Sequence, residues 1–87
     1  MKSKTVTVKN QYGIHARVAM DIVNKCKNYQ SEIKFCKDCS SADGCSILEI
    51  LMLEGTKDSV ITITASGEDE DMAIKELDLY FSNGAGI

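Results

Sequence analysis

Apolar side chains follow two different spacings along the chain, and each spacing predicts one kind of secondary structure. Apolar positions two residues apart, as in Lys4-Thr5-Val6-Thr7-Val8, are typical of a half-buried strand. Positions three or four apart predict an amphipathic helix from about Ala16 to Lys27, with Ala16, Ala19, Ile22, Val23 and Cys26 on its apolar side. In order, the spacings predict a strand at 4–8, a helix at 16–27, a strand at 32–36, a turn near Asp38-Cys39 and a short strand through Ala42, a helix to about Leu53, a strand at 60–65, and a helix that opens at Ser66-Gly67 and stops near Asn83-Gly84.

The start of the second predicted helix carries a capping box. In Ser46-Ile47-Leu48-Glu49, the Ser46 hydroxyl can accept a hydrogen bond from the Glu49 amide. The Glu49 carboxylate is then expected to accept from the Ser46 amide. Ser46 is therefore interpreted first as a helix cap.

The order βαββαβα predicts an α+β fold with a four-stranded antiparallel sheet. Its short connections favour antiparallel strands, with the three helices packed on one face. The other face would meet water, and the polar residues expected there are Thr5, Thr7, Lys34, Thr62 and Thr64. The chain shows no linker or internal repeat, so residues 1–87 are expected to form a single domain.

Composition excludes several classes of protein. With 44% hydrophobic and 26% charged residues, the chain is unlike a disordered tail. No apolar run approaches the roughly 18 residues of a membrane span, and MKSKTVTVKN lacks the apolar run of a signal peptide, so we expect a cytoplasmic protein without membrane insertion. A net charge of −3 argues against nucleic acid as the main partner, although a protein partner or a small anion could bind near Arg17, Lys25 and Lys27.

The four cysteines raise the possibility of metal or redox chemistry. Cys36-Lys37-Asp38-Cys39 is a CxxC motif, and Cys26 and Cys45 could join it. A zinc site normally shows a second pair of ligands or closely spaced histidines, whereas the one histidine here lies in another context. We therefore expect no metal and no cofactor, and reduced thiols that act as small apolar side chains. A small metal or thiol module stays open as an alternative function.

His15 is the strongest candidate for chemistry. It lies in Gly13-Ile14-His15-Ala16-Arg17, between a predicted strand and a predicted helix, at the N-cap position. The backbone amides of Ala16, Arg17 and Val18 would be free there, and the Arg17 guanidinium matches phosphate geometry. A histidine that is neutral near pH 7 offers a nucleophilic ring nitrogen. The pattern predicts an anion site around a nucleophile, against the simpler reading of a surface histidine after a turn.

Three segments resemble the HPr family, the histidine-containing phosphocarriers of the bacterial phosphoenolpyruvate-dependent sugar phosphotransferase system. They are Gly13-Ile14-His15-Ala16-Arg17, Ser46-Ile47-Leu48, and Ile61-Thr62-Ile63-Thr64-Ala65-Ser66-Gly67 with the acidic residues that follow. The resemblance implies an open-faced β-sandwich. It also implies that His15 accepts a phosphoryl group from phosphorylated enzyme I and passes it to enzyme IIA-type domains. Arg17 and the amides of Ala16, Arg17 and Val18 would hold the phosphate in a carrier that is not itself an enzyme.

The chain departs from the family pattern at two functional positions. Val18 stands where the family has proline, which gives up a rigid first turn but adds an amide, so we expect phosphoryl acceptance at an altered rate. Ser46 matches a serine that a kinase phosphorylates in Gram-positive relatives, where it helps a transcription factor control carbon catabolite repression. Asp43 and Glu49 would repel a phosphate, and Cys45 replaces a common lysine, so capping remains the favoured role of Ser46.

The resemblance also implies a docking surface for enzyme I and enzyme IIA. Its residues would be Met20, Ile47, Leu48 and Leu51, with Lys27 at the rim; core packing is the alternative for Leu51 and Leu48. We expect a monomer. The second hypothesis for function is a regulatory HPr-like paralogue that binds a transcription factor or enzyme without efficient phosphoryl transfer.

Overall fold

The computed structural model describes residues 1–38, 40–53 and 55–84. Its elements are β1 (Lys2–Thr7), α1 (Ala16–Cys26), β2 (Glu32–Lys37), β3 (Ser40–Asp43), α2 (Ile47–Met52), β4 (Val60–Ser66) and α3 (Glu70–Ser82). The predicted order βαββαβα is confirmed. Among the helices of these residues, none has the length and apolar character needed to cross a bilayer.

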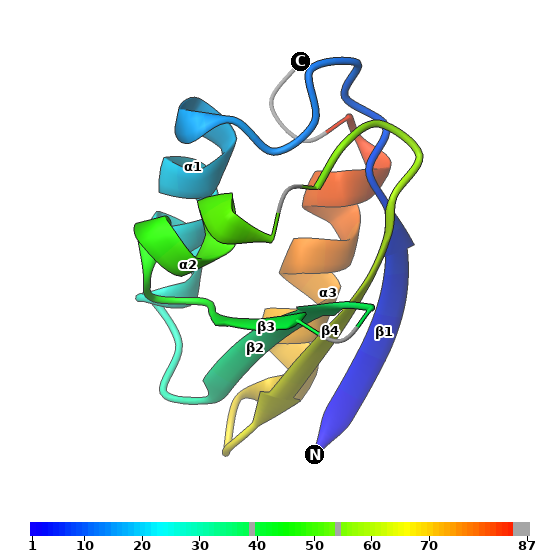
Figure 1. Cartoon of the computed structure of the whole chain (residues 1–87). Helices are drawn as coiled ribbons and strands as arrows, with labels where there is room; N and C mark the ends of the chain where they lie inside the picture. The colour runs from blue at the N-terminus through cyan, green and yellow to red at the C-terminus, as the bar shows by residue number, and fades with distance from the viewer. Residues whose placement is uncertain (39, 54, 85–87) are drawn as a thin grey trace.

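The four strands form one antiparallel sheet in the order β1-β4-β2-β3. The last strand in sequence, β4, therefore lies between β1 and β2, as Figure 1 shows. Val6 pairs with Ile61, and Phe35 pairs with Ile63, and all four side chains are buried. Because side chains alternate across a strand, these pairs define the sheet face that the helices cover.

The other sheet face stays open, as predicted from the alternating polar residues. Thr5, Thr7 and Lys34 are exposed, and Thr62 and Thr64 are half-buried. The structure confirms the α+β fold class and the open-faced β-sandwich, with three helices on one side of the sheet (Figure 1).

The core fills the space between the covered face and the helices. Phe35 from β2 and Phe81 from α3 are fully buried, with ring centroids 6.4 Å apart. Along α3, Ala73 and Leu77 are also buried, while Ile74 and Tyr80 pack partly buried against the core. Each fully buried large apolar side chain contributes about 1.5–3 kcal/mol to folding.

The capping box at α2 is only half correct. The Ser46 hydroxyl does accept from the Glu49 amide, at 3.3 Å. The Glu49 carboxylate, however, accepts from the Asp43 amide at 3.2 Å, because the Ser46 amide already donates to the Asp43 carbonyl at 3.0 Å. Ser46 is an N-cap, and Glu49 ties α2 to the end of β3.

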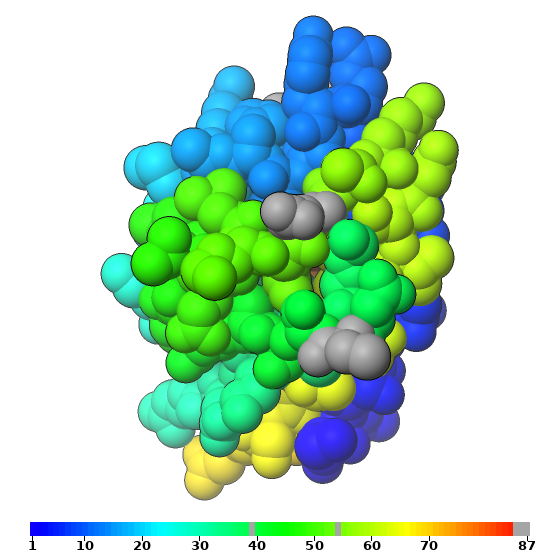
Figure 2. Space-filling view, viewed as in Figure 1, coloured from blue at the N-terminus to red at the C-terminus, as the bar shows by residue number. Residues whose placement is uncertain are grey.

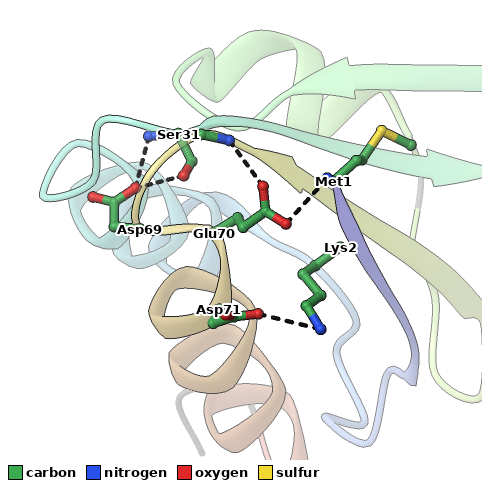
Figure 3. A network of polar contacts seen from close by, with 7 residues as sticks. Met1, Lys2, Ser31, Asp69, Glu70 and Asp71 are labelled. Atoms are coloured by element: carbon green, nitrogen blue, oxygen red, sulfur yellow. Dashed lines mark hydrogen bonds and ion pairs between the residues drawn. The ribbon is translucent and has the colours of Figure 1, made fainter.

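The start of α3 is later than the sequence predicts. The helix begins at Glu70, and its N-cap residue Asp69 makes no side-chain capping bond. Instead the Asp69 carboxylate accepts hydrogen bonds from the amide and the hydroxyl of Ser31, as Figure 3 shows, and from the amide of Gln30. These bonds hold the pKa of Asp69 below its usual range, with the Ser31 hydroxyl the largest cause. Asp69 therefore fastens the segment before β2 to the start of α3.

The neighbouring acidic residues hold the first strand. Figure 3 shows Glu70 between the Gly67 amide, 3.2 Å away, and the N-terminal amine of Met1, 3.1 Å away. Lys2 lies 3.4 Å from Asp71. The acidic block at the start of α3 thus contacts β1 at the edge of the sheet.

Cys26 lies on the buried side of α1, as the sequence predicted. Cys26 is buried, and burial raises its pKa to about 12. Cys36 is half-buried on the open sheet face, and Cys45 is exposed. Cys39, predicted in the hairpin turn, lies outside the described residues; the preceding Asp38 has a positive φ of 55°.

Candidate functional site

The segment before α1 is held by a second loop, residues 55–59, which precedes β4. Three backbone hydrogen bonds join the two loops: Val8 N to Ser59 O at 2.9 Å, Asp58 N to Val8 O at 2.7 Å, and Ile14 N to Gly55 O at 2.6 Å. Ile14 is itself buried. The backbone position of His15, the next residue, is therefore fixed by hydrogen bonds between the two loops.

Gly13 allows the two loops to come this close. Its φ is +69°, and a Cβ atom on it would lie 2.3 Å from the Gly55 carbonyl oxygen. The turn that leads to it is built by Asn10, whose side-chain oxygen accepts from the Tyr12 amide and whose carbonyl accepts from the Gly13 amide, both at 2.9 Å. A residue with a side chain at position 13 would force the loops apart.

His15 is the N-cap of α1, as predicted. Its backbone is extended, with φ −101° and ψ −179°, and its side chain makes no capping bond. Its carbonyl accepts from the Ala19 amide at 2.9 Å. Within the described parts of the chain, the amides of Ala16, Arg17 and Val18 have no backbone partner, so three donors at the positive end of the helix remain available beside the imidazole.

His15 and Arg17 open onto a pocket of about 630 Å³. The residues that line it are Lys9, Asn10, Gln11, Tyr12, His15, Arg17 and Lys57. The Tyr12 and His15 rings meet edge to face, with centroids 6.4 Å apart and planes at 78°. The lining carries three cationic side chains and no carboxylate, which suits an anionic ligand.

Two of these cations, Lys9 and Lys57, were missed by reading the sequence. They belong to loops far apart along the chain, and only the Val8–Asp58 pairing brings them together. Helical and strand periodicities relate only residues that are close along the chain, so they could not show that these two lysines lie together. Tyr12 was missed for a related reason, since a single exposed aromatic residue in a turn carries no periodic signal.

The sequence analysis placed a possible anion near Lys25 and Lys27, but neither lysine lines this pocket. Lys25 instead pairs with Glu76 at 3.3 Å and lies 5.1 Å from the Tyr80 ring centroid, between α1 and α3. Lys27 follows the last residue of α1. It is therefore about 18 Å along the helix axis from His15. The expectation of an anion beside these two lysines is wrong, because α1 carries them away from its own N-terminus.

Apolar side chains are also exposed on α1 and α2. Met20, Ile47 and Leu48 are 53%, 40% and 68% exposed, whereas Leu51 is half-buried against the core. Met52, which sequence reasoning left out, is 69% exposed. Figure 2 shows the start of α1 in blue directly next to α2 in green on one face of the molecule. We call Met20, Ile47, Leu48 and Met52 the α1–α2 surface.

The described cysteines and carboxylates do not gather into a metal site. Within residues 1–38, 40–53 and 55–84, no group of three or more histidine, cysteine, aspartate or glutamate side chains is placed to hold an ion. The chemistry of the described site rests on His15, the cations and the free amides.

Comparison with known proteins identifies the family. Residues 2–83 match the family model described as the PTS HPr component phosphorylation site. The phosphocarrier protein HPr of Borreliella burgdorferi is 38% identical over 77 residues, which cover 88% of this chain and 90% of that protein.

Solved structures agree with the sequence relatives. HPr of Thermoanaerobacter tengcongensis superposes with a TM-score of 0.95 at 33% identity, covering 100% of this chain and 98% of the other. Crh, a catabolite repression protein of Bacillus subtilis described as a domain-swapped dimer, gives a TM-score of 0.77 at 27% identity, with 98% of each chain covered. The chain therefore belongs to the HPr family of phosphocarrier proteins of the phosphotransferase system.

Proposed function

We propose that this chain carries a phosphoryl group on His15 between phosphorylated enzyme I and enzyme IIA-type domains. A ring nitrogen of His15 attacks the phosphorus atom with its free electron pair, and the bond to the donor atom of enzyme I breaks as the new bond forms. The second transfer repeats this exchange, with His15 as the leaving group. The observation that carries the proposal is the position of His15 at the N-cap of α1, beside Arg17 and in a cationic pocket.

The amides and Arg17 suit a carrier because they hold phosphate without a metal clamp. The free amides of Ala16, Arg17 and Val18 can donate to phosphate oxygens, and the helix dipole adds to the attraction. The exposed Arg17 adds a charged planar donor. A carrier must bind the phosphoryl group in both transition states without trapping it between them, and exposed donors meet that need.

The α1–α2 surface supplies the docking face in this proposal. Met20 exposes apolar area on α1, whose N-cap is His15, and Ile47 and Leu48 do so on the neighbouring α2. Leu51 of α2 packs partly buried against the core. Lys27 would lie at the rim, on the far end of α1. Enzyme I and enzyme IIA would use the same surface in turn, because each must present its own reactive group to His15.

A single-turnover assay tests the proposal. The chain is mixed with enzyme I and labelled phosphoenolpyruvate, and acid-labile phosphate on the protein is measured. We expect label on the wild type and none on His15→Ala, while Lys75→Gln, a charge change on the distant helix α3, labels normally. The absence of acid-labile phosphate that depends on His15 would refute the carrier function.

A regulatory paralogue is the second candidate, supported by the similarity to Crh. In this role a serine kinase would phosphorylate Ser46, and the product would bind a catabolite-control transcription factor. The Ser46 oxygen already accepts from the Glu49 amide, and the Asp43 and Glu49 carboxylates are close in sequence. Phosphate there would break the cap and meet negative charge, so we propose capping as the main role of Ser46. Mass spectrometry after incubation with such a kinase decides, and ready modification of Ser46 would contradict us.

We also propose that residues 1–87 act as one HPr-like domain, a cytoplasmic monomer. The described chain ends lie on one continuous core, since β1 and α3 both pack against β4. Light scattering at several protein concentrations tests the monomer, and a stable dimer at micromolar concentration would contradict it.

A further inference from the structure

Three cations, Lys9, Arg17 and Lys57, line the His15 pocket together. Lys2, Lys25 and Lys34 are ion-paired with carboxylates. In the described residues, Lys9, Arg17 and Lys57 form no such pair, and no carboxylate lines their pocket. A chain of net charge −3 thus concentrates three unpaired positive charges around one hollow.

The proposed phosphoryl group does not use all of this charge. A phosphoryl group on His15 would be served by Arg17 and the amides at the start of α1. Lys9 and Lys57 lie on the two loops that rise beside it, next to each other because Asp58 N donates to Val8 O at 2.7 Å. At the top of Figure 2 these loops, in blue and yellow-green, stand side by side. Two cations therefore remain for a further anionic group.

The size and lining of the pocket indicate a ligand larger than one phosphate. A volume of about 630 Å³ is within the range of sites for small organic molecules. Tyr12 is 76% exposed and forms a corner with the His15 ring. Exposed aromatic rings bind planar bases by stacking, and Asn10 and Gln11 add polar groups to the same lining.

We propose that this pocket binds a nucleoside di- or triphosphate, with its phosphates on Lys9, Arg17 and Lys57 and its base on Tyr12. The ligand would share Arg17 with the phosphoryl site and cover His15. A bound nucleotide would therefore compete with enzyme I, which would make phosphoryl flow through this protein sensitive to nucleotide concentration. The binding itself goes beyond the carrier function and does not depend on it.

The test is a titration of the unphosphorylated, isotope-labelled protein, followed by the amide resonances of Tyr12, Gly13 and Ala16. The probes are ATP and inorganic tripolyphosphate, each added to about millimolar concentration. We expect saturable shifts with ATP and about tenfold weaker binding by the double variant Lys9→Gln/Lys57→Gln. The matched control, Lys4→Gln/Lys75→Gln, removes the same charge from β1 and α3 and should bind as the wild type does.

The Tyr12→Leu variant distinguishes the contribution of the base to binding from that of the phosphates. We expect it to weaken ATP binding about fivefold or more and to leave tripolyphosphate binding unchanged. Equal binding of both probes without any effect of Tyr12 would overturn the nucleotide assignment. The proposal also fails if ATP shifts none of these amides, or if the control double variant loses as much affinity as the pocket variant. None of these measurements requires phosphoryl transfer, so a failure here and a failure in the single-turnover assay are distinguishable.

Discussion

Replacing Gly13 with alanine tests how the two loops position His15. The backbone at this residue has a φ of +69°, which costs an alanine about 1 kcal/mol or more. The new Cβ would lie 2.3 Å from the Gly55 carbonyl oxygen and 3.0 Å from the Thr56 Cα atom, both on the backbone, so no flexible side chain can move aside.

The loops must separate to relieve this contact. The same Gly55 oxygen accepts a hydrogen bond from Ile14 N at 2.6 Å, and this bond would be stretched or lost. Its loss would lower the free energy of unfolding by about 1–1.5 kcal/mol. Together with the strain in φ, we expect Gly13→Ala to lower the free energy of unfolding by about 2–3 kcal/mol. For a domain of this size, that corresponds to a fall in Tm of roughly 8–24 °C. Urea and thermal denaturation measure it, and slower labelling of His15 should accompany it.

Asp58→Ala is the matched control. Asp58 also has a positive φ, 71°, in the partner loop, but it is exposed. Because Asp58 already carries a Cβ at this φ, its replacement by alanine should cost less than about 1 kcal/mol. If Gly13→Ala is no more destabilising than Asp58→Ala, the close approach to Gly55 does not limit the loops, and our account of how His15 is positioned is wrong.

Four further predictions follow from other parts of the structure. Val18→Pro should lower the free energy of unfolding by no more than about 1.5 kcal/mol, from changed packing of a buried side chain, because the amide it removes has no described backbone partner; a larger loss in urea denaturation would contradict this. Asp69→Asn should destabilise the protein at neutral pH and progressively less as pH falls below 3.8, the ordinary pKa of an aspartate: hydrogen bonds lower the pKa of the folded Asp69, so its contribution is fully present above the unfolded pKa and is lost as pH falls through the folded one. Denaturation curves across this range check the sign, and a constant difference would contradict it. Alkylation followed by mass spectrometry should modify exposed Cys45 in the native state and Cys26 only after unfolding, since burial raises the pKa of Cys26 to about 12; native labelling of Cys26 would show that the end of α1 opens. Leu48→Ala should leave Tm within about 2 °C, because the side chain is 68% exposed, yet slow phosphorylation by enzyme I; an unchanged rate would remove Leu48 from the docking face.

Several local features were readable in the sequence because they depend on neighbours along the chain. Alternation fixed the faces of β2 and β4. Helical spacing identified most of the buried side of α1, but Ala16, predicted on that side, is exposed, and Val18, which the spacing left out, is buried. The N-cap role of His15 followed from the change of spacing at Gly13. Ser46 could be recognised as a cap because its partner, the Glu49 amide, is only three residues away.

Features that failed in prediction involve competing partners from elsewhere in the fold. The Glu49 carboxylate was expected to accept a hydrogen bond from the Ser46 amide. Instead the Ser46 amide donates to the Asp43 carbonyl, and the Glu49 carboxylate accepts from the Asp43 amide. The sequence placed Asp69 only within the helix predicted to open at Ser66-Gly67, whereas its carboxylate accepts hydrogen bonds from the segment before β2. In each case a carboxylate expected to act within its own helix accepts a hydrogen bond from another segment of the fold.

The candidate site shows the same division. The sequence by itself located His15, the helix N-terminus and Arg17, because these lie within three consecutive residues and the signal is local. Only the tertiary structure decided that Lys9 and Lys57 share the pocket with His15 and that Lys25 does not. The physical reason is that the loops before α1 and β4 are joined by backbone hydrogen bonds and the close approach at Gly13, which leave no periodic trace in the order of side chains.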